Sequence, residues 1–154
     1  MTLFFPDLNV WLALSDTTHV HGDDAWKWDH RLDANAKIAF SRFTQIGLLR
    51  LLATPSVMGS AVLTLAQAWD VYDRWLNDPN VEFFPEPRGV DAAFRHFTAP
   101  LASQAASKAV GDCWLLAHAS GIGATLVTFD RALHTLARKH GQAAVIPSGS
   151  SRTH

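Results

Sequence analysis

The sequence contains little cysteine, no large excess of charge and no long apolar run. Cys113 is the single cysteine, which excludes an internal disulfide, and its apolar helical surroundings predict a buried side chain. The formal net charge of -1 gives no overall basic surface of the kind that binds nucleic acid strongly without specificity. No apolar stretch approaches the roughly 18 residues that span a bilayer, and no positive region precedes the first apolar residues. We therefore expect a soluble, cytoplasmic protein with no membrane segment.

A glycine-rich phosphate loop, internal repeats and long linkers are missing as well. The stretch Gly121-Ile122-Gly123 is typical of a helix end rather than of a loop that cradles phosphate. With 154 residues, 48% of them hydrophobic, the chain is long enough to bury one core. We predict a single domain over residues 1–147 and a flexible tail over residues 148–154.

Short apolar runs alternate with helical patterns along the chain. Strands are predicted at residues 3–5, 38–40, 81–84, 125–128 and 143–146. Helices are predicted at residues 10–14, 23–33, 42–52, 64–76, 91–97, 112–120 and 131–140, with a loop or weak helix over the small residues 99–107. This alternation predicts an α/β fold in which helices cover both faces of a parallel sheet.

Three aspartates stand at the expected boundaries of these elements. Asp7 follows the first strand, Asp130 follows the fourth, and Asp112 is expected to begin a helix. Parallel strands end at one edge of a sheet, where α/β proteins bind ligands. Two carboxylates about 5 Å apart repel each other by roughly 3 kcal/mol, and hard oxygen ligands select Mg²⁺ or Mn²⁺ over zinc. The pattern predicts a divalent-metal site suited to hydrolysis of a phosphodiester by metal-activated water.

Each of these aspartates also has an ordinary structural explanation: the first as a turn residue, the other two as helix N-caps. The polar neighbours are open in the same way. Asn9 is either a capping side chain or a group that holds a metal-bound water, and Thr128 and Arg131 flank the last aspartate with the same two alternatives. His19 and His21 have a spacing that could ligate a metal, but with no cysteine or third histidine nearby we predict a surface loop.

Tryptophan and phenylalanine are more abundant than one small core readily covers. An exposed apolar groove, used by a partner or by a second copy of the chain, is therefore expected. Stacking on nucleic-acid bases is the less favoured explanation for the helical tryptophans. The residues concerned are Trp26, Trp28, Phe43, Trp69, Trp75, Phe94 and Phe97.

Taken in order, the motifs resemble those of the PIN-domain ribonucleases, and in particular the VapC toxins of bacterial toxin–antitoxin pairs. The resemblance covers nearly the whole chain and is carried by residues 5–14, by Asp112 ahead of its apolar run, and by residues 126–131. It implies a three-layer α/β/α fold with a central, mostly parallel sheet. It also implies a Mg²⁺- or Mn²⁺-dependent endoribonuclease that cleaves RNA until a VapB-like antitoxin occupies its site.

The resemblance further assigns roles to individual residues and to partners. It implies that Asp7, Asp112 and Asp130 bind the metal and are catalytic, and that Asn9 and Thr128 line the site. The expected assemblies are a homodimer and a toxin–antitoxin hetero-oligomer.

One acid of the family pattern is missing. The family usually has a glutamate in the helix after the second strand, whereas this chain has no Asp or Glu between Asp33 and Asp70. Gly47 stands at the acid's place, or Gln45 after a small shift, and we expect Thr44 and Gln45 to line the site. Two alternative functions follow: a PIN-fold binding module with weakened catalysis, and a metal-dependent DNA nuclease or phosphatase.

Overall fold

A five-stranded parallel sheet forms the centre of the computed structural model, which describes residues 2–148. Every pairing is parallel, and the order is β3-β2-β1-β4-β5. The strands are β1 (Leu3–Pro6), β2 (Lys37–Phe40), β3 (Val81–Phe83), β4 (Thr125–Val127) and β5 (Ala144–Val145). The chain runs outward from β1 to β3 and then returns to the other side of β1, so the strand order reverses between β1 and β4. Ligands of open α/β sheets bind at such a switch point.

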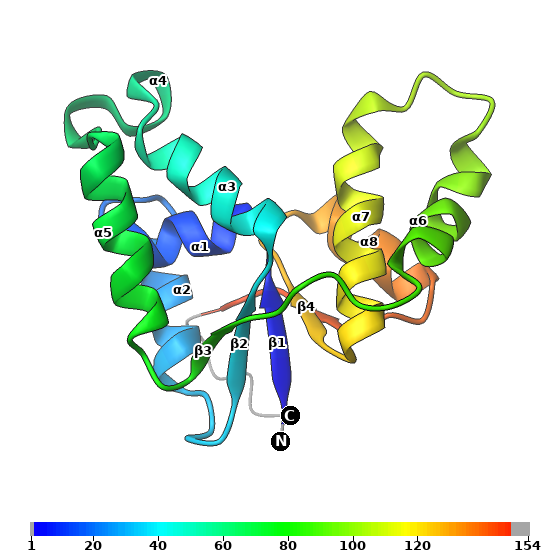
Figure 1. The fold of residues 1–154 in the computed structure, drawn as a ribbon, viewed down its shortest axis with the longest axis horizontal. Coiled ribbons are helices and arrows are strands. Elements are labelled where there is room, and N and C mark those ends of the chain that lie inside the picture. Colours follow the sequence, from blue (N-terminus) through cyan, green and yellow to red (C-terminus); the bar gives the residue numbers. More distant parts are fainter. Residues whose placement is uncertain (1, 149–154) are drawn as a thin grey trace.

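Helices cover both faces of this sheet (Figure 1). On one side lie α1 (Leu8–Ser15), α2 (Gly22–His30), α3 (Arg42–Leu52) and α5 (Leu65–Leu76). On the other side lie α6 (Val90–Thr98), α7 (Ser107–Ile122) and α8 (Arg131–Lys139). Two short helical turns follow α3: α4 (Pro55–Met58) and η1 (Gly59–Ala61). One short turn, η2 (Ala99–Leu101), follows α6. The predicted three-layer α/β/α fold is confirmed.

An apolar core fills the space on each side of the sheet. On the side of α1, α3 and α5, Trp11 stacks on Phe40 with ring centroids 3.6 Å apart, and both are fully buried. On the side of α7 and α8, Phe5 packs with Leu126 and with His118, whose ring stacks on that of Phe5 at 4.9 Å. Burial lowers the pKa of His118, which favours the neutral ring, and the ring packs as an aromatic side chain. Each large apolar side chain buried in this way contributes about 2 kcal/mol.

Side-chain hydrogen bonds begin α3 and α5. Ser41 and Thr44 form a capping box at α3, in which each side chain bonds to the other residue's backbone N–H. Thr64 and Gln67 form the same arrangement at α5. Each box satisfies backbone donors that a helix end leaves free, which is why both helices start where the sequence indicates.

The start of α7 differs from the prediction. The helix begins at Ser107, so Asp112 lies in its second turn and the expectation that Asp112 opens the helix is wrong. Ala106 precedes the helix and supplies no side-chain cap, so the sequence carries no start signal there. Helix α3 ends at Leu52 as predicted, and Pro55 then begins the unpredicted turn α4, because proline suits a first helical position.

Two predictions concern the ends of the chain and the membrane. Of the predicted flexible tail, residues 149–154 lie outside the described residues, and the division at residue 147 stays a prediction. Within residues 2–148, no helix is long and apolar enough to cross a bilayer.

Candidate active site

Asp7 lies at the junction of β1 and α1 and is almost completely buried, with 5% of its surface exposed. Its Oδ1 accepts a hydrogen bond of 2.7 Å from the backbone N–H of Asn9 and caps α1, while its Oδ2 accepts one from the Thr128 hydroxyl. Burial raises the pKa of Asp7, the bonds from Thr128 and Asn9 oppose that shift, and the charge of Asp130 adds to it. A nearby cation would favour the ionised carboxylate.

Asp130 occupies the corresponding place after β4. Its Oδ1 accepts hydrogen bonds from the backbone N–H groups of Ala132 and Leu133, at 2.9 and 3.2 Å, and caps α8. Its own backbone N–H donates to the Thr128 hydroxyl at 3.0 Å. Because this hydroxyl also donates to Asp7, the fully buried Thr128 joins the two acids and fixes their relative position.

Asp112 reaches the site from α7 and is half-buried. Burial raises the pKa of Asp112, the charge of Asp130 raises it further, and Lys108 lowers it. Its carboxylate accepts no hydrogen bond from any of residues 2–148, and it does not cap α7. Helix capping therefore accounts for Asp7 and Asp130 but leaves Asp112 without a structural role.

The three aspartates line one pocket of about 300 Å³, called the acidic pocket below. It lies where β1 and β4 end, at the switch point of the sheet. The other lining residues are Leu8, Asn9, Phe43, Arg50, Leu51, Gly111 and Leu115. Asp7 thus meets two acids that lie more than a hundred residues away in sequence, at the edge of the sheet that the strand pattern indicates.

The structure separates the other predicted site residues. Asn9 lines the acidic pocket, and Thr128 lies behind it as the partner of Asp7. Thr44 and Gln45 are buried at the start of α3, and Arg131 is exposed at the start of α8; none of the three lines the pocket. Any role of these three in the site stays a prediction.

Thr44 and Gln45 have local partners instead. The Thr44 hydroxyl belongs to the cap of α3, and the side-chain oxygen of Gln45 accepts a hydrogen bond from the Arg42 guanidinium. Arg50 and Phe43 also line the pocket, a position that was not predicted for either residue. Their spacing of seven residues in a predicted helix was the available signal, because such residues share a helix face.

Gly47, one of the two candidates for the place of the missing acid, allows α3 to pack closely on α1. A Cβ atom built on Gly47 would lie 2.2 Å from Cδ2 of Leu8, which lines the acidic pocket. That separation is far below van der Waals contact, so any side chain at residue 47 must displace Leu8. A glutamate there would disturb the pocket wall in this chain.

This packing predicts a contrast between two helical glycines. The free energy of unfolding of Gly47→Ala is expected to be about 2 kcal/mol lower than that of Gly111→Ala. A Cβ on Gly111 meets only the Phe43 ring at 3.5 Å, so that variant keeps the usual helical gain of alanine over glycine. Urea denaturation of both variants measures the difference. Equal stability of the two would show that Leu8 moves aside freely.

His19 and His21 form a small local cluster beside the site. The backbone N–H of His21 donates to Nδ1 of His19 at 3.0 Å, and the His21 ring stacks on Phe129 at 4.3 Å. Burial and the neighbouring His21 lower the pKa of His19. Within residues 2–148 no third His, Cys, Asp or Glu gathers with these two histidines. The hydrogen bond and the ring stacking fix the conformation of the loop.

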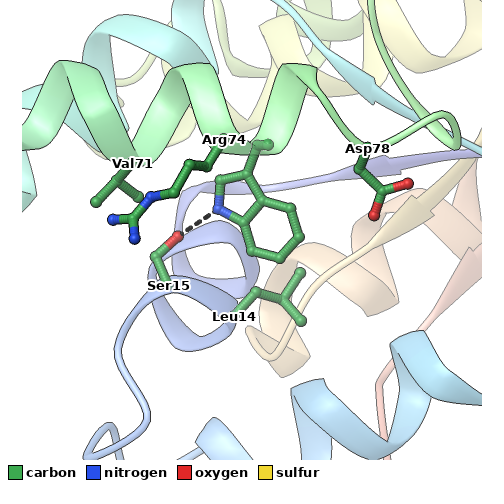
Figure 2. A pocket seen from close by; sticks show the side chains of 6 residues that line it. Leu14, Ser15, Val71, Arg74 and Asp78 are labelled. Carbon is green, nitrogen blue, oxygen red and sulfur yellow. Dashed lines mark hydrogen bonds between the residues drawn. The ribbon is translucent and has the colours of Figure 1, made fainter.

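Another pocket, also of about 300 Å³, lies between the end of α1 and α5 (Figure 2). The Trp75 indole N–H donates to the Ser15 hydroxyl at 2.9 Å across it. Leu14, Val71, Arg74 and Asp78 complete its lining. With one carboxylate and no acid from the acidic pocket, it lacks the donors for a multi-carboxylate metal centre.

The donors of the acidic pocket suit a hard divalent cation in kind. All three ionisable groups with metal-ligand chemistry there are carboxylates, which favour Mg²⁺ or Mn²⁺. Over residues 2–148, however, no three His, Cys, Asp or Glu side chains gather tightly enough to hold an ion by themselves. Water or substrate oxygen atoms would have to complete the coordination, as is usual for Mg²⁺.

Comparison with known proteins identifies the family. The model of the PIN domain matches residues 4–139, which is most of the chain. The chain belongs to the PIN-domain family. This PIN domain is 38% identical over 130 residues to "Ribonuclease VapC41" of Mycobacterium tuberculosis, with 82% of this chain and 88% of the relative covered.

Solved structures give the same fold at lower identity. VapBC2 from Rickettsia felis, bound to a promoter DNA fragment, matches with a TM-score of 0.71 and 16% identity over 96% of this chain and 100% of the other. VapBC-1 from nontypeable Haemophilus influenzae matches with a TM-score of 0.68 and 15% identity over 94% and 98%. These structural similarities support the PIN fold. The 38% sequence identity indicates a closer relationship to the ribonuclease VapC41 than to either of these two structures.

Proposed function

We propose that this PIN domain is a metal-dependent endoribonuclease and the toxin of a VapBC-type toxin–antitoxin pair, acting in the cytoplasm. The observation that carries the proposal is the meeting of Asp7, Asp112 and Asp130 in one pocket at the switch point of the sheet. A close relative named as a ribonuclease supports the substrate class.

The proposed mechanism assigns the metal to the three carboxylates. Asp7, Asp112 and Asp130 would hold Mg²⁺ or Mn²⁺, and when bound the ion lowers the pKa of a water and neutralises charge on the phosphodiester. Thr128 holds Asp7, and backbone N–H groups of α8 hold Asp130, so neither acid needs to reorient before it acts. Asn9 adds an amide to the same pocket. No protein nucleophile is required.

Loss of the fourth acid has a consequence for metal affinity. With three carboxylates that do not close around an ion, the RNA-free protein is expected to bind metal weakly. A substrate phosphate would supply the remaining oxygen ligands and tighten binding. Gln45→Glu would pair with Arg42 rather than turn to the pocket, so that variant is not expected to restore a tight site.

The proposed antitoxin and second copy need an apolar surface. Five exposed apolar side chains occur in the segment from α4 to α5, namely Val57, Val62, Leu65, Trp69 and Leu76. Of the aromatic residues expected at such a surface, Trp26, Phe43 and Trp69 are exposed whereas Phe97 is buried. The exposed set supports a partner surface of the kind that toxin–antitoxin pairs use.

Expression in a bacterium tests this function. We expect growth arrest from the parent protein and normal growth from Asp112→Asn, which removes a carboxylate without removing a cap. Equal toxicity of the parent and Asp112→Asn would contradict the proposed mechanism.

The missing acid specifically favours one alternative, a PIN-fold binding module with weak catalysis. Purified protein incubated with Mn²⁺ and labelled RNA, single-stranded DNA or a small phosphate ester separates the possibilities. Cleavage of RNA alone supports the proposal, cleavage of DNA or ester indicates a broader phosphoesterase, and binding without cleavage indicates the module.

A further inference from the structure

Arg50 brings a positive charge to the acidic pocket. It lines the pocket together with Asp7, Asp112 and Asp130, from the last turns of α3. Its side chain is exposed, and it forms no ion pair with any carboxylate within the described residues. A guanidinium beside three carboxylates that nevertheless pairs with none of them is available to a ligand.

The packing of α3 sets this position. Phe43, Arg50 and Leu51 lie seven and eight residues apart and all line the pocket, so one face of α3 forms its wall. Gly47 lies on the same side and lets α3 approach Leu8 of α1 closely. Gly47 therefore brings the next turn, and Arg50 with it, close to the pocket.

The negative charge of the pocket explains why a cation such as Arg50 is needed there. Three carboxylates exceed the charge of one divalent cation, so a phosphodiester anion would meet a negative pocket unless another cation is present. Arg50 is the cation among the residues that line the pocket. Arg42 donates to Gln45 and lies 4.7 Å over the Phe83 ring, and neither Arg131 nor Lys108 lines the pocket.

We propose that Arg50 binds a phosphate of the RNA backbone beside the three carboxylates, an inference that rests on the proposed nuclease function. A guanidinium suits this task because it can bond two phosphate oxygens at once and stays charged at all relevant pH values. On the α3 wall of the pocket Gly47 carries no charge and Arg50 a positive one, so this wall attracts a substrate phosphate and repels a metal cation.

Three variants test the assignment: Arg50→Gln, Arg50→Lys and, as a matched control, Arg138→Gln. Arg138 is an exposed arginine at the end of α8 that does not line the acidic pocket. The rate of cleavage, as kcat/KM, is measured on the RNA that the parent cleaves best, at several salt concentrations with Mn²⁺. Calorimetry then measures Mn²⁺ affinity of each protein without RNA.

Arg50→Gln is expected to lower kcat/KM by roughly tenfold to a hundredfold. The slope of log kcat/KM against log salt concentration should become shallower by about one unit. It should also tighten Mn²⁺ binding by a few-fold, because a cation near the metal is lost. Arg50→Lys should recover part of the rate, and Arg138→Gln should match the parent. A role in folding alone would not tighten metal binding.

The outcomes separate this inference from the function on which it rests. If the parent cleaves RNA and Arg50→Gln has the rate, salt slope and Mn²⁺ affinity of Arg138→Gln, the role of Arg50 is overturned and the nuclease stands. If the parent cleaves no RNA while remaining folded, both are overturned.

Discussion

Asp7→Asn is expected to abolish RNA cleavage and, at the same time, to stabilise the folded protein. Loss of one metal ligand should remove several kcal/mol of transition-state stabilisation, or roughly a thousandfold in rate. In metal-free buffer the variant should be about 1 kcal/mol more stable than the parent. The reason is that the parent buries the Asp7 carboxylate, and burial disfavours its ionised form. Asparagine keeps the cap of α1, since its oxygen can accept from the backbone of Asn9.

The stability gain should depend on pH in a defined direction. Burial raises the pKa of Asp7 in the folded state above its ordinary value of 3.8, so ionisation opposes folding. The variant's advantage should therefore be full at neutral pH and shrink as the pH falls through the folded pKa toward 3.8. Urea denaturation in EDTA across this range measures it, with Asp16→Asn, which replaces a more exposed carboxylate at the other end of α1, as the control. A parent more stable than Asp7→Asn at pH 7 would contradict the account.

Asp130 allows the catalytic and structural roles of one side chain to be separated. Asp130→Asn and Asp130→Ala are both expected to lose about a thousandfold in cleavage rate, because each removes the carboxylate. Only the alanine variant also loses the oxygen that caps α8 through Ala132 and Leu133. It should therefore be about 1 kcal/mol less stable than the asparagine variant.

Cleavage assays and urea denaturation on the same preparations give both quantities. The asparagine variant is the internal control, since it keeps the cap and the size of the side chain. Parent-like cleavage by Asp130→Asn would mean that this aspartate is only a helix cap.

The sequence is informative where an apolar strand ends in a polar residue. Asp7 and Asp130 could be placed at one edge of the sheet because parallel strands end together, and both lie there. Their dual role as caps and pocket residues could not be resolved from sequence, since capping and ligand binding use the same residue type at the same place. The Thr128 hydroxyl that joins them depends on a contact across 121 positions of the chain.

The sequence is less informative where helices pack against each other. The start of α7 was misplaced because its N-cap residue, Ala106, makes no side-chain hydrogen bond. Arg50 and Phe43 could be assigned to a helix but not to the pocket, because the close approach of α3 to α1 depends on the contact of Gly47 with Leu8. Such contacts follow from tertiary packing, which local patterns do not encode.

The most direct test of the central claim is cleavage of labelled cellular RNA by the parent and by Asp112→Asn, each with Mn²⁺ and with EDTA. Asp112 is the informative residue because its carboxylate lines the acidic pocket and caps no helix, so its loss leaves the fold intact. We predict cleavage by the parent with Mn²⁺ and none in the other three reactions. Parent-like cleavage by Asp112→Asn, or cleavage by the parent in EDTA, would contradict a nuclease in which these carboxylates act through a metal ion.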